Sequence, residues 1–205
     1  VRYKMKDNNS KQVLLSVLGV AILVVAVVGV SFAAFSYSKS GEKVNTITTG
    51  TITMSYSETT NGINLTNALP MTDAVGRKLK EENQYFDFTV NATISGNTTI
   101  NYAITATKES DSTIPDTGVK VYLTDMDGDA DTEIVPPTKV SELDVTASDV
   151  SGAPDDQYLL TSNTFNASSS HDYRLRMWVA DDYVVGTDAQ TYKLRVNVYG
   201  TANAQ

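Results

Sequence analysis

The stretch Gln84–Ala106 reads QYFDFTVNATISGNTTINYAITA, and its period of two decides the fold class. Apolar side chains alternate with polar ones at positions 86–94 and again at positions 100–106. Such alternation is typical of half-buried β-strands. The intervening Ser95-Gly96-Asn97 is a turn sequence, so the two runs predict a β-hairpin.

The same alternation recurs along much of the chain. It is clearest in two C-terminal runs, Tyr173–Val179 and Tyr192–Val198. It is weaker in three other runs, Ile52–Tyr56, Val119–Leu123 and Tyr158–Phe165. We expect Tyr158–Phe165 to be an edge strand and residues 124–157 to be a long acidic connection with a brief helix near Val140–Leu143. With almost no helix after residue 34, the pattern predicts an all-β protein, an antiparallel β-sandwich of jelly-roll type.

An uncharged segment, Val13–Ala34, precedes the predicted strands. As a helix it would be about 33 Å long, enough to cross a bilayer. The basic residues before it and the small residues at its end also describe an export signal. We therefore expect a signal peptide (or membrane anchor) over residues 1–34, cleavage between Ala34 and Phe35, a strand-prone tail over 35–49 and the sandwich domain over 50–205. We expect only residues 13–34 to contact the membrane and the remainder of the chain to work outside the cytoplasm.

Composition narrows the function classes. The 205 residues carry 16 Lys and Arg against 24 Asp and Glu, a net charge of −8. Such an acidic chain argues against nucleic acid as a partner, because phosphate contacts need Lys and Arg. There is no cysteine and a single histidine, His171, and no His-Glu-x-x-His string occurs. The usual zinc-protease machinery is therefore missing, and we expect no enzyme activity and no catalytic residues.

Several strings resemble those of a known family. They are the junction Ala33-Ala34-Phe35-Ser36, the strand Asn45–Met54 (NTITTGTITM), the segments Leu69–Gly76 and Tyr85–Asn91, and Tyr173–Trp178 (YRLRMW). Together they resemble the TasA and camelysin family of secreted proteins processed by a SipW-type signal peptidase. The resemblance implies a jelly-roll domain that is exported and assembled into biofilm-matrix or cell-surface fibres. It also implies that the mature N-terminal segment completes the sheet of a neighbouring subunit.

The tail after the cut has the residues that such an exchange needs. Phe35, Tyr37, Val44 and Ile47 are apolar positions in a strand-prone segment that would begin at a free end. A strand of this kind can add to an exposed sheet edge, and a head-to-tail contact that does not close builds a filament of identical copies. Two alternatives remain open, since the tail could pair within its own domain or stay disordered.

The densest acidic string is Asp125-Met-Asp127-Gly-Asp129-Ala-Asp131. Carboxylates at every second position around a glycine can gather oxygen ligands for Ca²⁺. The spacing departs from an EF-hand loop, whose glycine is at the sixth position and whose bidentate Glu is at the twelfth. The alternative is a solvated acidic turn, in which case the protein has no cofactor.

Arg174, Arg176 and Trp178 fall on one side of a predicted strand. If that strand pairs with Tyr192–Val198, these residues and Lys193 and Arg195 make a basic stripe. The stripe could serve as an interface with an acidic neighbour, or its cations could pair with cross-strand carboxylates. An outward Trp178 could stack on carbohydrate or be covered by loops. We expect His171 to be a surface residue at a strand edge.

These observations predict an exported, non-enzymatic structural subunit of an extracellular fibre, biofilm matrix or cell-surface layer. Its partners would be a signal peptidase during export and, afterwards, copies of itself. The alternative is a membrane-anchored adhesin ectodomain that binds Ca²⁺ or carbohydrate. A secreted camelysin-like metalloprotease is a third interpretation.

Overall fold

The computed structural model describes residues 36–40, 45–49, 52–58, 62–63, 68–148, 151–186 and 188–204, all within one compact unit, Ser36–Gln205. The strands in these ranges are β1 (Ser36–Ser40), β2 (Asn45–Thr49), β3 (Ile52–Glu58), β4 (Tyr85–Thr93), β5 (Thr98–Lys108), β6 (Val119–Asp125), β7 (Thr132–Lys139), β8 (Tyr158–Phe165), β9 (Ser169–Val179) and β10 (Leu194–Ala204). The helices are short: α2 (Asp73–Gly76), and two 3₁₀ turns, η1 (Asp116–Gly118) and η2 (Val140–Glu142).

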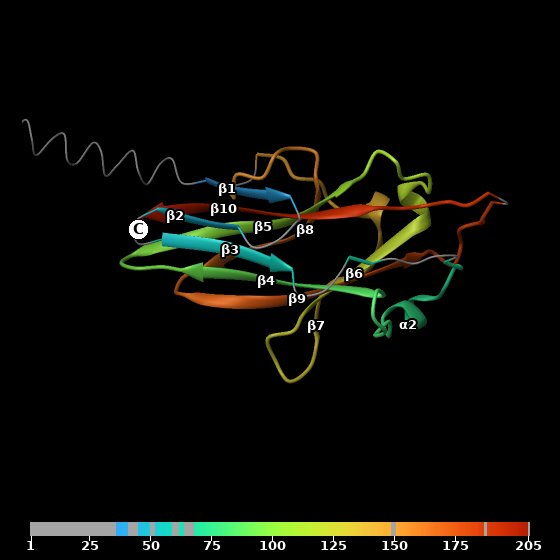
Figure 1. Cartoon of the computed structure of the whole chain (residues 1–205), viewed down its shortest axis with the longest axis horizontal. Helices are drawn as coiled ribbons and strands as arrows, with labels where there is room; N and C mark the ends of the chain where they lie inside the picture. Colours follow the sequence, from blue (N-terminus) through green and yellow to red (C-terminus); the bar gives the residue numbers. More distant parts are fainter. Residues whose placement is uncertain are drawn as a thin grey trace, which may run out of the picture. The chain divides into compact units, whose positions relative to one another are not determined.

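The strands form two antiparallel sheets (Figure 1). Four strands make one sheet in the order β1-β10-β5-β8, and six make the other in the order β2-β3-β4-β9-β6-β7. We call them the four-stranded and the six-stranded sheet. The prediction of an all-β, antiparallel protein is confirmed, and the strand near Tyr158 is an edge strand, as expected.

The strand pairs are nested along the chain. β1 pairs with β10, β4 with β9, β5 with β8, and β6 with β7. The first and last of these strands, β1 and β10, lie side by side. Along the sequence, both members of each inner pair fall between the two members of the next outer pair. The contacts β10–β5 and β9–β6 then join the pairs into sheets.

The predicted hairpin of residues 84–106 is wrong, although both of its strands exist. β4 belongs to the six-stranded sheet and β5 to the four-stranded one. Their apolar residues, such as Phe88 and Ile104, face one core from opposite sides and are fully buried. The connection between them bonds to the corresponding crossing between β8 and β9, where the Ile94 backbone N–H donates to Ser168 Oγ at 2.8 Å. Alternation fixes which side chains are buried but does not select the partner strand.

The two C-terminal runs also form separate sheets, since β9 lies beside β4 and β6 while β10 lies beside β1 and β5. A further strand, β7, occupies part of the stretch expected to be a connection. It contains Pro136-Pro137, which would break a central strand because proline donates no backbone hydrogen bond. β7 is at the sheet edge, where the missing donors cost little.

Aromatic side chains join the two sheets in the core. The Phe88 ring stacks on Tyr173 with centroids 5.4 Å apart. The hydroxyl of Tyr173 then lies 2.7 Å from that of Tyr102 in the opposite sheet. Both tyrosines are buried, so each hydroxyl finds in the other the hydrogen-bond partner that burial demands.

The hydrophobic segment 13–34 and the cleavage residues Ala34 and Phe35 lie outside the described residues. Within the described ranges, no helix combines the length and the apolar character needed to span a membrane.

Candidate functional site

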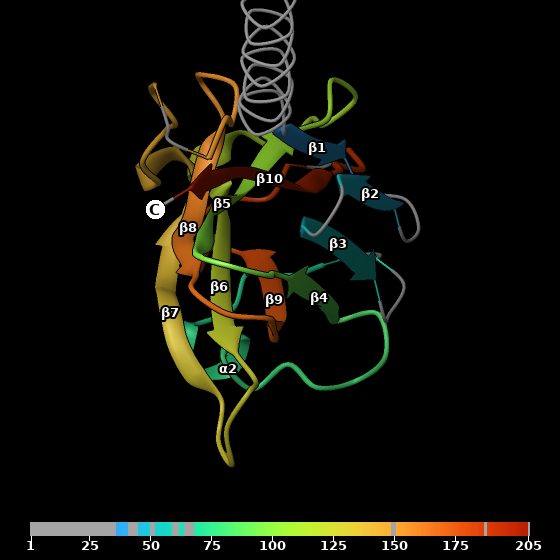
Figure 2. The same ribbon diagram turned by 90° about the vertical axis from the view of Figure 1, so that its left-hand side faces the viewer.

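The N-terminal tail supplies one edge strand to each sheet (Figure 2). β1 pairs with β10, placing Tyr37 opposite Gly200. β2 pairs with β3, placing Ile47 opposite Met54. In this structure the tail therefore pairs within its own chain, which is one of the alternatives left open by the sequence. Of the residues predicted for strand exchange, Phe35 and Val44 lie outside the described residues.

On one side of β10 and of β4, the described strand pairing is shorter than the strand itself. The described pairing of β1 reaches Asn197–Thr201 of β10, whereas the pairing of β5 with β10 begins at Leu194. Similarly, the described pairing of β3 reaches Phe88–Thr93 of β4, whereas the pairing of β9 with β4 begins at Tyr85.

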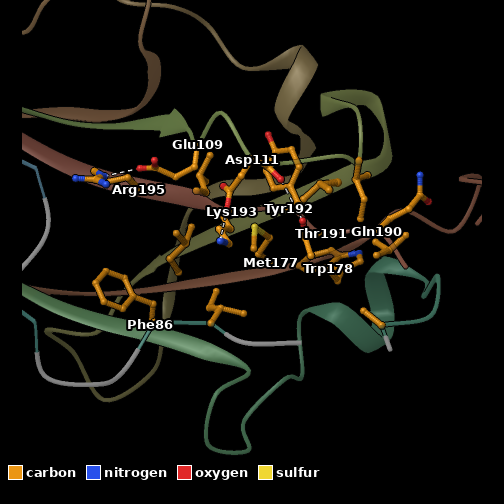
Figure 3. Close-up of a pocket in the computed structure, with 18 of the residues that line it drawn as sticks. Phe86, Glu109, Asp111, Met177, Trp178, Gln190, Thr191, Tyr192, Lys193 and Arg195 are labelled. Carbon is orange, nitrogen blue, oxygen red and sulfur yellow. Dashed lines mark hydrogen bonds and ion pairs between the residues drawn. The ribbon is translucent and has the colours of Figure 1, made fainter. Parts of the chain in front are cut away.

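A groove with an apolar floor lies between these two strands (Figure 3). Its floor comes from both sheets and includes Phe86, Leu175, Met177 and Val196. Its volume is about 1360 Å³, above the range of about 300–1,000 Å³ usual for small-molecule pockets. The groove therefore has room for an extended polypeptide.

Charged pairs line one rim of the groove. Arg195 Nε donates to Glu109 Oε1 at 2.5 Å, and Lys193 pairs with Asp111 (Figure 3). The lining also includes exposed apolar residues, since Leu69 is 72% exposed and Val185 is 43% exposed. An apolar floor beside a sheet edge can bind a strand through backbone hydrogen bonds and alternate side chains.

The predicted interface of Arg174, Arg176 and Trp178 is wrong as an exposed surface. β9 and β10 do not pair, so the basic stripe does not form. Arg174 instead makes a two-pronged ion pair with Asp87, with both N···O distances 2.7 Å. Its guanidinium carbon also lies 4.0 Å from the centroid of the Tyr85 ring. The hydrogen bond with Asp87 raises the pKa of Arg174. The alternative of a cross-strand partner is confirmed for Arg174, which lies opposite Asp87 across β9 and β4.

Arg176 and Trp178 are buried beneath the segment that contains α2. The Arg176 side chain donates to the Leu79 carbonyl at 2.7 Å. Trp178 is 1% exposed and packs with Leu79 and Tyr122. A Cβ on Gly76 would lie only 2.3 Å from the indole, so this glycine permits the close approach. Trp178 is therefore covered by a loop and does not offer a face to carbohydrate.

The acidic string is divided between two partners. Asp127 Oδ2 lies 2.6 Å from His171 Nδ1, with Asp125 close by. Asp131 instead lies 3.3 Å from Arg176 Nη2, and Asp129 is exposed. Because Asp127 and Asp131 contact different partners, the four carboxylates do not converge on one point. His171 is the third residue of β9, near the beginning of a central strand, and its side chain is half-buried.

One polar centre had no signal in the sequence. Asp116 in η1 accepts hydrogen bonds from Tyr158 and Tyr192, both at 2.8 Å, and from Lys108 at 3.0 Å. Burial alone would raise the pKa of Asp116, but these three donors outweigh it and the pKa is lowered. Burial and the neighbouring carboxylate raise the pKa of Tyr158 to about 12. The donors come from three distant segments, which no local pattern could bring together.

No protein-family model matches the chain, and no significant match exists among curated proteins or among solved structures.

Proposed function

We propose that this protein is an exported structural subunit of an extracellular fibre, biofilm matrix or cell-surface layer. Its copies assemble by exchanging the N-terminal strands. The resemblance of residues 33–54 to the TasA and camelysin family supports the class of protein. Under this proposal the protein is secreted after cleavage between Ala34 and Phe35, and it is not an enzyme.

The nested pairing supports the jelly-roll part of the proposal. A jelly roll has eight strands in two sheets and arises when one long antiparallel hairpin is rolled up. The pairs β1–β10, β4–β9, β5–β8 and β6–β7 support that arrangement. β2 and β3 extend the six-stranded sheet beyond β4.

The observation that carries the proposal is the placement of β1. It is at a sheet edge, pairs only with β10 among the described strands, and directly follows the expected cleavage junction. A terminal edge strand can leave without disturbing any other strand pair. The same pairing can then form with a neighbouring copy, which is the low-cost route of domain swapping.

The groove gives the exchanged tail a second contact. β10 and β4 flank an apolar floor that a strand from another copy can cover. Each subunit would then donate its tail to one neighbour and receive a tail from another. Because donor and acceptor surfaces differ, the assembly stays open and grows as a filament.

Deletion of residues 35–46 tests the proposal. We expect the full protein to form filaments visible by electron microscopy and the deleted protein to remain as single subunits. Filaments of unchanged length and number after deletion would contradict strand exchange. Circular dichroism of the deleted protein should still report β-structure, because six of the eight described strand pairs involve neither β1 nor β2. A folded but non-assembling protein is the informative outcome.

A membrane-anchored adhesin ectodomain remains the alternative. The cluster of Asp125, Asp127 and His171 favours it in one respect, since the cluster could bind a cation. The buried Trp178 counts against carbohydrate stacking at the predicted place. N-terminal sequencing of protein collected from culture medium separates the two: a sequence that begins at Phe35 supports the released subunit, and retention of residues 13–34 supports the anchored form.

A further inference from the structure

The β6–β7 connection, yellow at the bottom of Figure 2, contacts the first half of β9. β6 ends at Asp125, which pairs in register with Tyr173 of β9. His171 lies two residues before Tyr173 on β9, beside Asp127 of the connection. One carboxylate oxygen each from Asp125 and Asp127 and one ring nitrogen of His171 lie within 4.8 Å of one another. Three metal-ligating groups from two elements thus converge.

Backbone donors hold both carboxylates in place. The Asp127 N–H donates to Asp125 Oδ1, and the Asp172 N–H donates to Asp127 Oδ1, both at 2.8 Å. The second oxygen of Asp127 faces His171 Nδ1 at 2.6 Å. The Met126 N–H also donates to the Asp172 carbonyl at 2.8 Å, which fastens the connection to β9. Such outer contacts orient metal ligands before the metal arrives.

The imidazole is also fixed from the core side. Its ring lies against Phe165 with centroids 5.1 Å apart, and against Tyr173 at 6.3 Å. Its side chain is 27% exposed, so solvent and ions reach the site. The ring is therefore oriented by packing while one edge meets the carboxylates.

We propose that Asp125, Asp127 and His171 bind one divalent transition-metal ion, with Zn²⁺ as the best fit. Zn²⁺ takes imidazole nitrogen and carboxylate oxygen at about 2.0–2.2 Å, and three protein ligands with one water complete a tetrahedron. Ligands around such an ion are ~3.3 Å apart, so His171 and Asp127 need to separate only slightly from their hydrogen-bonded distance. Ca²⁺ is a poorer fit, because it takes 6–8 oxygen ligands.

The site differs from the oxygen-only loop that the sequence predicts. It excludes Asp129 and Asp131 and includes His171, which is distant in the chain. Metal binding at this place would tie the β6–β7 connection to β9 and stabilise the folded subunit. The inference stands apart from strand exchange, because the cluster lies on β6 and β9 and not on the N-terminal tail.

The test measures binding of ZnCl₂ and of CaCl₂ to the full chain, purified with a tag that contains no histidine. We expect one Zn²⁺ per chain by calorimetry. At metal concentrations near 100 times the dissociation constant, the melting temperature should rise by on the order of 5 °C. The variants Asp127→Asn and His171→Asn should weaken Zn²⁺ binding by about 100-fold or more. The matched control Asp129→Asn, in the same connection, should leave it unchanged.

Proton NMR of the unmodified chain provides a readout that does not depend on any variant folding. The chain has one histidine, so its imidazole resonances are assigned without ambiguity. Saturating Zn²⁺ should shift them. Unchanged imidazole resonances, absence of Zn²⁺ binding at millimolar concentration, or Ca²⁺ binding that depends on Asp129 and not on His171 would each overturn the proposal.

Discussion

At the scale of single residues, close approaches between the elements rest on specific atoms. Gly76 lets α2 lie directly on the Trp178 indole, and the hydroxyls of Tyr102 and Tyr173 meet between the sheets. Neither feature follows from alternation, which says only that a side chain points inward or outward. Trp178 in particular has an outward position, and only the segment before β4 makes it a buried residue.

Gly76→Ala should destabilise the protein. The added methyl would lie about 2.3 Å from a buried, rigid indole, and such overpacking costs ~1–3 kcal/mol. Urea unfolding measures the loss. The matched control is Gly62→Ala, because a Cβ there meets nothing within 4 Å. Equal stability of the two variants would mean that α2 does not pack on Trp178 as described.

The tyrosine pair should show energetic coupling. Tyr102→Phe or Tyr173→Phe leaves the other hydroxyl without this partner, at a cost of roughly 1 kcal/mol for each single change. The double variant should lose less than the sum, because no hydroxyl remains to be stranded. Additive losses in a double-mutant cycle would contradict the 2.7 Å contact.

At the scale of elements, the sequence predicts strands well and their neighbours poorly. Six strands coincide with a stretch in which apolar and polar residues alternate: β4, β5, β6, β8, β9 and β10. The predicted hairpin of β4 with β5 was nevertheless wrong, and the conditional pairing of β9 with β10 does not form, because a period of two is the same for any partner. β7 was missed because its two prolines argue against a strand, and only its place at the edge reconciles them.

The same limit applies to the candidate sites. The acidic string was recognisable from its composition, but its connection to His171 depends on β6 lying beside β9. The groove depends on where two strand pairings stop, and no residue pattern marks those positions. Contacts between distant segments decide both sites.

The Asp116 centre links η1, β5, β8 and the segment before β10, and it should make stability depend on pH. The folded pKa of Tyr158 is about 12, above the value of about 10 for an unfolded chain. Its stabilisation is therefore present below pH 10 and is lost as the pH rises through 12. Asp116 has a lowered pKa, so its contribution is present above about pH 4 and is lost as the pH falls further.

Asp116→Asn is the variant that tests this centre. Removing the carboxylate removes one of the causes that raise the pKa of Tyr158, so tyrosine ionisation should begin at a lower pH. A spectrophotometric tyrosine titration measures it, and thermal melts from pH 9 to about 12 follow the stability. Asp111, an exposed carboxylate that pairs with Lys193, offers a control. Asp111→Asn should leave the tyrosine titration unchanged. Identical titrations of all three proteins would contradict the Asp116 contacts.

At the scale of the whole molecule, the first and the last of the described strands are neighbours. β1 and β10 pair, and they do so at the edge where an exchange of strands requires the fewest other changes. If the protein is a fibre subunit that exchanges strands, the β1 that pairs with a given β10 comes from a neighbouring copy. The described register and the lack of native cysteine make this claim directly measurable.

The measurement mixes two single-cysteine proteins, Ser36→Cys and Thr201→Cys, under assembling and oxidising conditions. These positions are register partners across β1 and β10, within the reach of a disulfide if the strands pair. A mixture of Asn91→Cys and Ser170→Cys, register partners on the central strands β4 and β9, is the control. Strand exchange predicts a disulfide-linked dimer of the two different proteins in the first mixture and not in the second. Filaments that form without that dimer would contradict the central claim.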